Sequence, residues 1–246
     1  MALPALVLVH GGEHAADCWD FVVAELAERE PHLKVLAVDL PGRRDKPGDL
    51  RALDIGVAVE SVVDDIHAAD LSEVVIVGHS IAGVTVPGVA GVLGSARVRE
   101  MIFAACHIPP QGASILDAIG GPLSLFALYT TRTTKPFLMP KLVARLAFCN
   151  GMTREQREFM LSHRYRDSVR LYNDKVDRRT MPTEIPRTWI LTRGDRILSQ
   201  RAQRKSIAAL GGVDTIIPVD SCHDLMISRP SWLADTLLQR CRRYEG

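Results

Sequence analysis

Residues 74–83 read VVIVGHSIAG and decide the fold of this chain, because a short β-branched run delivers a serine into a cluster of small residues. This is the pattern of a nucleophile elbow, a sharp strand-to-helix turn that lifts a serine hydroxyl above a sheet. The turn closes only if the residues two before and two after the serine are small. Gly78 and Ala82 meet that requirement around Ser80, although the usual second residue is glycine. A glycine-rich turn with an incidental serine is the alternative interpretation.

A serine nucleophile needs a base and an orienting acid, and candidates for both follow later in the chain. Residues 188–191 form a predicted strand that leads into a loop carrying Asp195. Residues 215–219 form the next predicted strand and lead into a loop carrying His223. The carboxyl ends of parallel strands lie at one rim of a sheet. Ser80, Asp195 and His223 are therefore expected to meet at that rim.

Three other aspartates compete with Asp195 for the role of the acid. Asp220 and Asp224 are so close to His223 in sequence that they would have to fold back to reach its ring. Both are expected to be local loop residues. Asp214 precedes its predicted strand and falls at the wrong end of it. Asp195 is thus the predicted acid, with a solvated turn aspartate as the alternative.

The first loop of the chain is the candidate for an oxyanion site. An apolar run at residues 5–9 precedes HGG at positions 10–12. The tetrahedral intermediate of ester cleavage carries a negative charge that must meet prepositioned donors. The segment is similar to the loop that lends a backbone N–H in lipases and esterases, where the residue after the nucleophile supplies the second. The predicted donors are Gly12 and Ile81.

These segments together resemble α/β-hydrolases of the plant methylesterase and hydroxynitrile lyase type and their bacterial relatives. The order serine, aspartate, histidine along the chain is that of α/β-hydrolases. The resemblance implies that Ser80, Asp195 and His223 form the catalytic triad. The matching segments cover essentially the whole chain: LVHGG at 8–12, CW at 18–19, VLAVDLPG at 35–42, the elbow, and residues 186–199 followed by a helix, a strand and the histidine.

One departure from this resemblance bears on the reaction. Hydroxynitrile lyases of this type carry a lysine directly after the catalytic histidine and a threonine in the first loop. Here Asp224 and Gly11 stand at those places. This argues against cyanohydrin cleavage, but the same fold and constellation host many other reactions.

Alternating strand and helix patterns predict an α/β fold with a mostly parallel six-stranded sheet flanked by helices. The whole chain, 1–246, is expected to be a single α/β-hydrolase domain. The stretch at about 107–185 shows no clear strand and is predicted to be an inserted helical cap over the rim. The predicted strands are 5–9, 33–38, 73–78, 99–105, 187–192 and 214–219. The predicted helices are 17–29, 54–68, 81–93, 199–210 and 229–243, with 138–148 and 153–173 in the cap.

The bulk composition favours a soluble cytoplasmic enzyme. A net charge of +1 gives no reason to expect nucleic acid or a membrane as partner. The five cysteines are scattered and read as reduced thiols, with Cys222 a disfavoured alternative nucleophile. The start of the chain lacks the basic region of a signal peptide. The expected partner is a small-molecule substrate, and a homodimer is a further expectation.

No metal or cofactor is expected, because no histidine and carboxylate cluster has convincing ligand spacing. His10 and His14 are interpreted as loop residues, His10 as a brace of the first loop.

The cap gives the only hints about the substrate. Its apolar residues suit an uncharged or aromatic acyl group, although most of them could simply be cap core. They are Leu123, Leu125, Phe126, Leu128, Tyr129, Phe137, Leu138, Met139 and Phe148. The resulting prediction is a serine hydrolase that cleaves a small, largely apolar or aromatic carboxylic ester through an acyl-enzyme. The alternatives are a cofactor-free lyase or cyclase on the same triad and a ligand-binding receptor on a hydrolase scaffold.

Overall fold

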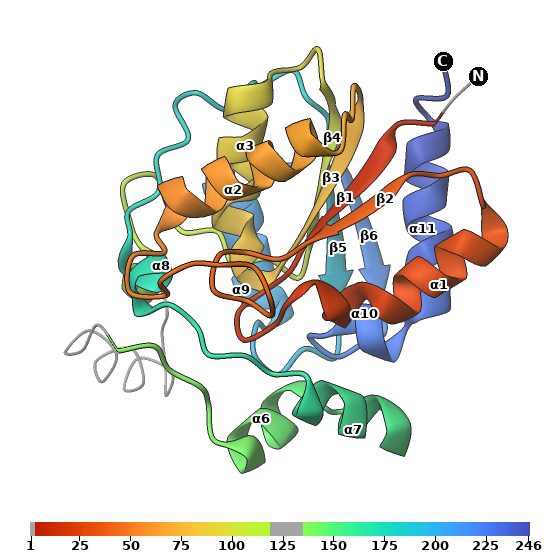
Figure 1. Ribbon diagram of the computed structural model, residues 1–246. Coiled ribbons are helices and arrows are strands. Elements are labelled where there is room, and N and C mark those ends of the chain that lie inside the picture. Colours follow the sequence, from red (N-terminus) through yellow and green to blue (C-terminus); the bar gives the residue numbers. More distant parts are fainter. Residues whose placement is uncertain (1–2, 119–134) are drawn as a thin grey trace.

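The protein is described by a computed structural model that covers residues 3–118 and 135–246 (Figure 1). Six strands form one parallel sheet in the order β2-β1-β3-β4-β5-β6. The strands are β1 (Ala5–Val9), β2 (Val35–Val38), β3 (Val74–His79), β4 (Val98–Ala104), β5 (Arg187–Thr192) and β6 (Thr215–Val219). The six predicted strands are confirmed, with ends that differ by at most two residues.

Helices cover both faces of the sheet (Figure 1). One face carries α2 (Ile55–Ala68), α3 (Val86–Leu93) and α9 (Gln200–Ala209). The other carries α1 (Asp20–Arg29), α10 (Leu225–Ser228) and α11 (Pro230–Arg242). Two short 3-10 turns, η1 (Ala16–Trp19) and η2 (Ser80–Val84), precede α1 and α3. The segment between β4 and β5, here called the insertion, contains α4 (Ile115–Ala118), α6 (Lys141–Phe148), α7 (Arg154–Ser162) and α8 (Val169–Asn173).

The strands are almost continuously apolar because both faces of the sheet are buried. Alternate residues enter different cores, as side chains of a strand must. Val7 and Ile76 pack in the core beneath α2 and α3, whereas Leu6 and Val75 pack in the core beneath α1 and α11. Register is fixed across the sheet, with Val7 paired to Ile76.

In the described part of the insertion, one predicted helix differs from the structure, and α4 has no counterpart among the predicted helices. The helix expected over 153–173 is two helices, α7 and α8, so that prediction is wrong. Residues 163–168 between them turn back toward the first loop. There the Tyr165 amide donates to the Glu13 carbonyl oxygen at 2.9 Å, and Asp167 pairs with Phe137 in an isolated β-bridge. Ser168 then caps α8 by accepting from two of its backbone amides.

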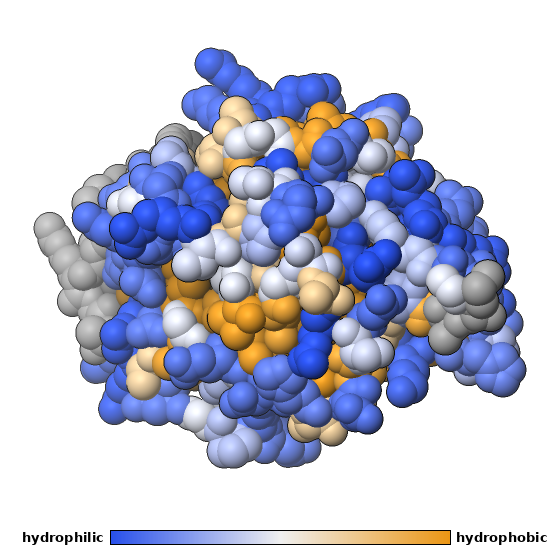
Figure 2. Space-filling model, turned by 90° about the horizontal axis from the view of Figure 1, so that it is seen from above, coloured by the Kyte–Doolittle hydropathy of each residue, from blue (hydrophilic) through white to orange (hydrophobic). Residues whose placement is uncertain are grey.

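Five of the apolar residues predicted for the cap, Leu123, Leu125, Phe126, Leu128 and Tyr129, lie outside the described residues. Within the described ranges, no helix is long and apolar enough to cross a membrane. Figure 2 views the molecule from above, the side opposite α6 and α7 in Figure 1, and shows a mainly hydrophilic surface on which apolar residues form small patches.

Candidate active site

Ser80 occupies a strained turn directly after β3. Its backbone φ is +53°, in the left-handed region. Such a conformation costs a non-glycine residue about 1–3 kcal/mol and persists only where the surroundings enforce it. A Cβ on Gly78 would come within 2.7 Å of Val86 Cγ2, so the turn requires glycine there. Ala82 is buried and its methyl group is accommodated. The backbone geometry predicted from residues 74–83 is therefore present.

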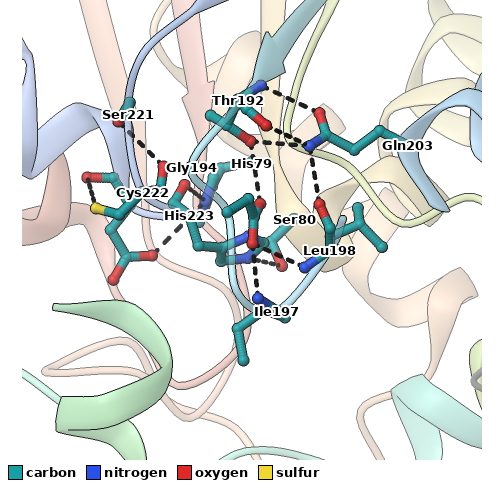
Figure 3. Close-up of polar contacts among 12 residues, drawn as sticks. His79, Ser80, Thr192, Gly194, Ile197, Leu198, Gln203, Ser221, Cys222 and His223 are labelled. Carbon is teal, nitrogen blue, oxygen red and sulfur yellow. Dashed lines mark hydrogen bonds and ion pairs between the residues drawn. The ribbon is translucent and has the colours of Figure 1, made fainter. Parts of the chain in front are cut away.

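Ser80, His223 and Asp195 lie in one hydrogen-bonded chain at the carboxyl ends of β3, β6 and β5. His223 Nε2 is 2.8 Å from Ser80 Oγ, a contact that can be followed in Figure 3. His223 Nδ1 is 2.7 Å from Asp195 Oδ2. A carboxylate only accepts hydrogen bonds, so Nδ1 carries the ring hydrogen and Nε2 accepts from the serine hydroxyl. The structure thus brings together the three residues that the sequence singled out.

The Asp195 carboxylate is buried and fully hydrogen bonded. Its Oδ2 also accepts from the Thr192 hydroxyl at 3.0 Å, and its Oδ1 accepts from the amides of Ile197 and Leu198 at 2.8 and 2.7 Å. Burial raises the pKa of Asp195, but the charge and hydrogen bond of His223 and the amide donors outweigh burial and hold that pKa below its usual value. Asp195 is therefore ionised at neutral pH.

Gln203 on α9 fixes the loop that carries Asp195. Its side chain is completely buried. Its Oε1 accepts from Trp189 Nε1 and from the Thr192 amide, both at 3.2 Å. Its Nε2 donates to the carbonyl oxygens of Thr192 and Leu198, both at 2.9 Å (Figure 3). One side chain thereby ties together β5, the loop and the helix that follows.

The environment of His223 makes its imidazole more basic than usual. Burial lowers the pKa of His223, but the charge and hydrogen bond of Asp195 and the charge of Asp224 outweigh burial and raise that pKa above its ordinary value. Of the competing acids, Asp220 is an exposed loop residue and Asp214 precedes β6 at the far end of the strand, both as predicted. Neither reaches the His223 ring.

Asp224 does not fit its prediction as a local loop residue, because it lies in a buried cluster with His14 and His79. Its Oδ1 is 3.3 Å from His14 Nε2 and 3.8 Å from His79 Nε2. The carboxylate accepts only, so His14 Nε2 carries a hydrogen. His79 Nε2 also carries one, because it donates to the His223 carbonyl oxygen at 3.1 Å.

Two imidazoles and a carboxylate with ligand atoms within 4.8 Å of one another have the composition of a zinc site. The two Nε2 atoms that face Asp224 are, however, the donors of the hydrogen bonds just described. A protonated ring nitrogen has no lone pair for a metal. We therefore interpret the cluster as a hydrogen-bonded network, and the expectation of no metal cofactor stays a prediction.

The first loop carries the residues predicted to bind an oxyanion. His10 is completely buried, its Nδ1 donates to the adjacent backbone carbonyl at 2.8 Å, and its Nε2 accepts from the Leu40 amide at 3.2 Å. This confirms that His10 braces the loop. Gly12 and Ile81 both line the cavity that contains Ser80. Within the described residues, no protein acceptor takes the Gly12 amide hydrogen.

The insertion contacts the first loop through Asp167. This residue is completely buried and forms an ion pair with the buried Arg43. Its Oδ2 accepts from the Glu13 amide at 3.0 Å and from the Tyr172 hydroxyl at 3.1 Å. A Cβ on Gly12 would overlap the Tyr172 hydroxyl, so this packing requires glycine at position 12.

A cavity of about 180 Å³ opens at Ser80. Its described lining is mainly apolar and comes from both the sheet rim and the insertion. The apolar lining residues are Ile81, Ile115, Leu116, Ala118, Phe137, Met139, Phe148, Ile197, Leu198 and Ala202. Three of the apolar residues predicted for the cap, Phe137, Met139 and Phe148, therefore line the cavity. Leu138 is instead exposed.

His107 adds a polar group to this apolar lining. Its backbone amide donates to the Ser80 carbonyl oxygen at 3.0 Å, which places it beside the serine turn. Burial and the charge of His223 lower the pKa of His107 to about 4, so its imidazole is neutral. Within the described part of the chain, its ring makes no hydrogen bond.

Cys222 is a poor candidate for the nucleophile. Burial raises the pKa of its thiol to about 12, so the thiol is protonated at neutral pH. It lines a different cavity, with Asn150 and Gly194. All five cysteines are free and buried, as expected of reduced thiols.

Three parts of the site were not predicted. They are the Gln203 side chain, the cluster of His14, His79 and Asp224, and the contacts of Asp167 with Arg43 and the first loop. In the last two, the partners are distant in sequence, 210 positions for His14 with Asp224 and 124 for Arg43 with Asp167. A single sequence contains no local signal for such pairs. Gln203 could have been suspected only as a polar residue on the buried face of a predicted helix.

Comparison with known proteins places these observations in context. The sequence profile of the "Alpha/beta hydrolase family" matches residues 6–236. Esterase PIR7B of Oryza sativa subsp. japonica is 23% identical to the chain, over 97% of this chain and 96% of that protein. The dihydrolipoyllysine-residue acetyltransferase component of an acetoin cleaving system from Pseudomonas putida is 28% identical over 87% of this chain. The chain spans only about half, 52%, of that second relative.

A solved structure shares the fold. It is an extracellular α/β-hydrolase from a Paenibacillus species, described as having structural and functional homology to tobacco salicylic acid binding protein 2. It superposes with a TM-score of 0.84 at 20% identity, over 96% of this chain and 98% of that one.

Proposed function

We propose that this chain, which belongs to the alpha/beta hydrolase family, is a serine esterase that cleaves small, largely apolar or aromatic carboxylic esters through an acyl-enzyme. The observation that carries the proposal is the hydrogen-bonded chain from Ser80 through His223 to Asp195, with contacts of 2.8 and 2.7 Å, at an apolar cavity. A serine held beside a base that is itself oriented by an ionised acid is arranged for nucleophilic catalysis.

The hydrogens on His223 Nδ1 and on the Ser80 hydroxyl determine how acylation would proceed. His223 Nε2 takes the Ser80 hydroxyl proton as Oγ attacks the ester carbonyl carbon. The imidazolium that forms is stabilised by the Asp195 carboxylate. When the tetrahedral intermediate collapses, the bond to the alcohol oxygen breaks and His223 gives its proton to that oxygen. The alcohol leaves, and the acyl group remains on Ser80.

The amides of Gly12 and Ile81 are the proposed donors for the oxyanion, because both residues line the cavity at Ser80. Deacylation repeats the sequence with water as nucleophile and His223 as its base, and releases the carboxylic acid. The Asp167 and Tyr172 contacts would keep the Gly12 amide in place throughout. No cofactor takes part in these steps.

The proposed substrate class follows from the cavity. An apolar protein cavity of about 150 Å³ holds one benzene ring, so about 180 Å³ suits a single ring or a short alkyl chain. We assign the insertion the role of a cap, because Phe137, Met139 and Phe148 line the cavity together with rim residues.

A serine-reactive fluorophosphonate tests the proposal. It is expected to add once per chain, seen as one adduct by intact mass, and to map to Ser80. Ser80→Ala should abolish both labelling and the hydrolysis of aryl and alkyl methyl esters, whereas Cys222→Ala should label normally. An adduct on Cys222, or ester turnover that survives in Ser80→Ala, would exclude the covalent mechanism.

Cyanohydrin cleavage is not the favoured reaction. The buried Asp224 carboxylate follows His223 where the lyases carry a lysine, and a negative charge there disfavours a departing cyanide ion. The protein is expected to release no useful cyanide from mandelonitrile. Robust release with saturation kinetics would instead support the lyase alternative.

A further inference from the structure

The Asp224 carboxylate is buried next to the proposed base without a cationic partner. Its side chain has no solvent exposure. Among the described residues, its ion-pair contacts are only with His14 and His79, and its Oδ2 has no hydrogen-bond partner. Burying a carboxylate is costly unless a positive charge compensates it. The site therefore contains a negative charge that its immediate neighbours satisfy only in part.

This carboxylate is nevertheless ionised. Burial raises the pKa of Asp224, but its electrostatic interaction and hydrogen bond with His14, and to a smaller extent its interactions with His79 and His223, outweigh burial and hold that pKa below its usual value. His79 is neutral, because burial and the charge of His223 lower its pKa to about 3. His79 thus offers Asp224 a dipole and no full charge.

His79 also connects the carboxylate to the base by direct packing. Its Nε2 is 3.8 Å from Asp224 Oδ1 and donates to the His223 carbonyl oxygen at 3.1 Å. The ring centroids of His79 and His223 are 4.8 Å apart, with the planes inclined at 55°. The cluster therefore lies against the imidazole that is to become charged, and all four residues are buried.

We propose that Asp224 is a positioning residue whose charge supports the cation that forms on His223 during ester cleavage. The inference rests on the proposed function. His223 is neutral before reaction and gains the Ser80 proton in the transition state. Asp195 stabilises that cation by a hydrogen bond, and Asp224 does so through space. No bond to Asp224 forms or breaks. Because the attraction exists only once His223 is charged, it lowers the barrier without tightening substrate binding.

Other titratable groups surround His223 and Asp224 and could also affect a pH profile. Near His223 they are Asp195, His79 and His107, and near Asp224 they are His14, His79, Cys18, Cys149 and Cys222. Burial raises the pKa of each of the three thiols and lowers the pKa of His79 and His107 to about 3 and about 4. His14 contacts Asp224 directly and therefore needs its own variant.

The test is the pH dependence of kcat/KM for Asp224→Asn on one activated ester. The acid limb reports protonation of His223 in the free enzyme. Removing the nearby negative charge should lower the pKa of His223 and move the limb about one pH unit lower, with kcat on the plateau about tenfold lower, since one unit corresponds to a tenfold preference. KM should change by less than about twofold, because the interaction is absent in the ground state.

Three variants complete the design. Asp224→Glu retains the charge and should keep the wild-type limb. His14→Gln retains a hydrogen-bond donor for Asp224 but removes the strongest of the interactions that keep this carboxylate ionised, so its limb should move in the same direction as that of Asp224→Asn. Asp220→Asn, on the exposed part of the same loop, should behave as wild type. Circular dichroism confirms folding, and Asp224→Ser replaces Asp224→Asn if the latter does not fold.

The outcomes separate this inference from the proposed function. If the wild-type protein neither turns over esters nor labels at Ser80, the proposed function fails and the inference falls with it. If the wild type does both, but the charge-free variant keeps the wild-type limb, Asp224 has no electrostatic effect on His223. A limb that moves equally in Asp224→Glu, which retains the charge, would show that the shift comes from altered packing and would overturn the proposal.

Discussion

The strand rim and the insertion meet at one cavity, but they are held in place by different forces. At the rim, Ser80 is fixed by its backbone turn, and Asp195 by hydrogen bonds from residues two and three positions away. The insertion is attached to the rest of the chain by two buried ion pairs, Asp167 with Arg43 in the loop after β2 and Arg164 with Glu13 in the first loop. Local geometry therefore positions the proposed chemistry, whereas long-range charge pairs position the wall of the cavity.

This difference between the rim and the insertion predicts two kinds of mutational effect. A change at the rim that keeps shape should reduce kcat while the fold is retained. A change in the insertion's ion pairs should reduce the free energy of unfolding and weaken substrate binding, because it removes a charge partner from a buried site. The variants below test that separation.

The largest expected effect is that of Asp195→Asn at the rim. The amide can still be held by the loop, but it leaves the His223 imidazole in the wrong tautomer and its cation unsupported. By analogy with the serine-protease triad, kcat should fall on the order of 10⁴-fold. The measurement is kcat/KM on one activated ester, with circular dichroism to show that the fold is intact.

Asp220→Asn is the matched control, because Asp220 is an exposed aspartate on the neighbouring loop, which follows β6 and carries His223. It should cost about tenfold or less, in line with the small effects of most surface substitutions. Near-native activity in Asp195→Asn, together with a collapse in Asp220→Asn, would mean that the acid comes from the histidine loop.

The next largest effect should come from Asp167→Asn in the insertion. The substitution leaves the buried Arg43 without its charge partner. Breaking a buried pair in this way costs about 3–5 kcal/mol, so the free energy of unfolding measured in urea should fall by that order. The Glu13 amide would lose its charged acceptor as well, and KM should rise more than kcat falls.

Asp177→Asn is the control within the same insertion, because the Asp177 pair with Arg179 is exposed. It should change the free energy of unfolding by less than about 0.5 kcal/mol. If Asp167→Asn instead left stability intact and abolished kcat alone, the insertion would take part in the chemistry and the proposed division would be wrong.

The difference between local and long-range contacts also explains what could be predicted from the sequence. The six strands, the turn at Ser80 and the approach of Asp195 and His223 follow from local patterns and from the rule that parallel strands end at one rim. Each of these signals lies within about ten residues of sequence. The resemblance to α/β-hydrolases strengthened the choice of Asp195 over its competitors.

The contacts that escaped prediction join distant residues through buried charge. The sequence predicts Asp224 as a local loop residue, because nothing near it in sequence indicates that His14 and His79 surround it. The break between α7 and α8 has a similar origin, since residues 163–168 leave the helix to reach the first loop. Tertiary hydrogen bonds there overrode a pattern that locally favours one helix.

The smallest expected effect, and the sharpest comparison of the two regions, concerns His107. It lies at the start of the insertion, where its backbone is bonded to the Ser80 carbonyl at the rim and its neutral ring lines the cavity. In His107→Phe an apolar ring replaces a group that can hydrogen bond. A neutral hydrogen bond contributes about 0.5–1.5 kcal/mol. We therefore expect kcat/KM to fall by roughly two- to tenfold for a hydroxyphenyl ester and to stay unchanged or rise for the matching phenyl ester.

Phe148→Leu is the comparison variant, because it shortens the apolar wall of the cavity and should lower kcat/KM for both esters. An equal loss on both esters in His107→Phe would show that residue 107 supports only the serine turn, and that substrate selection lies with the later residues of the insertion.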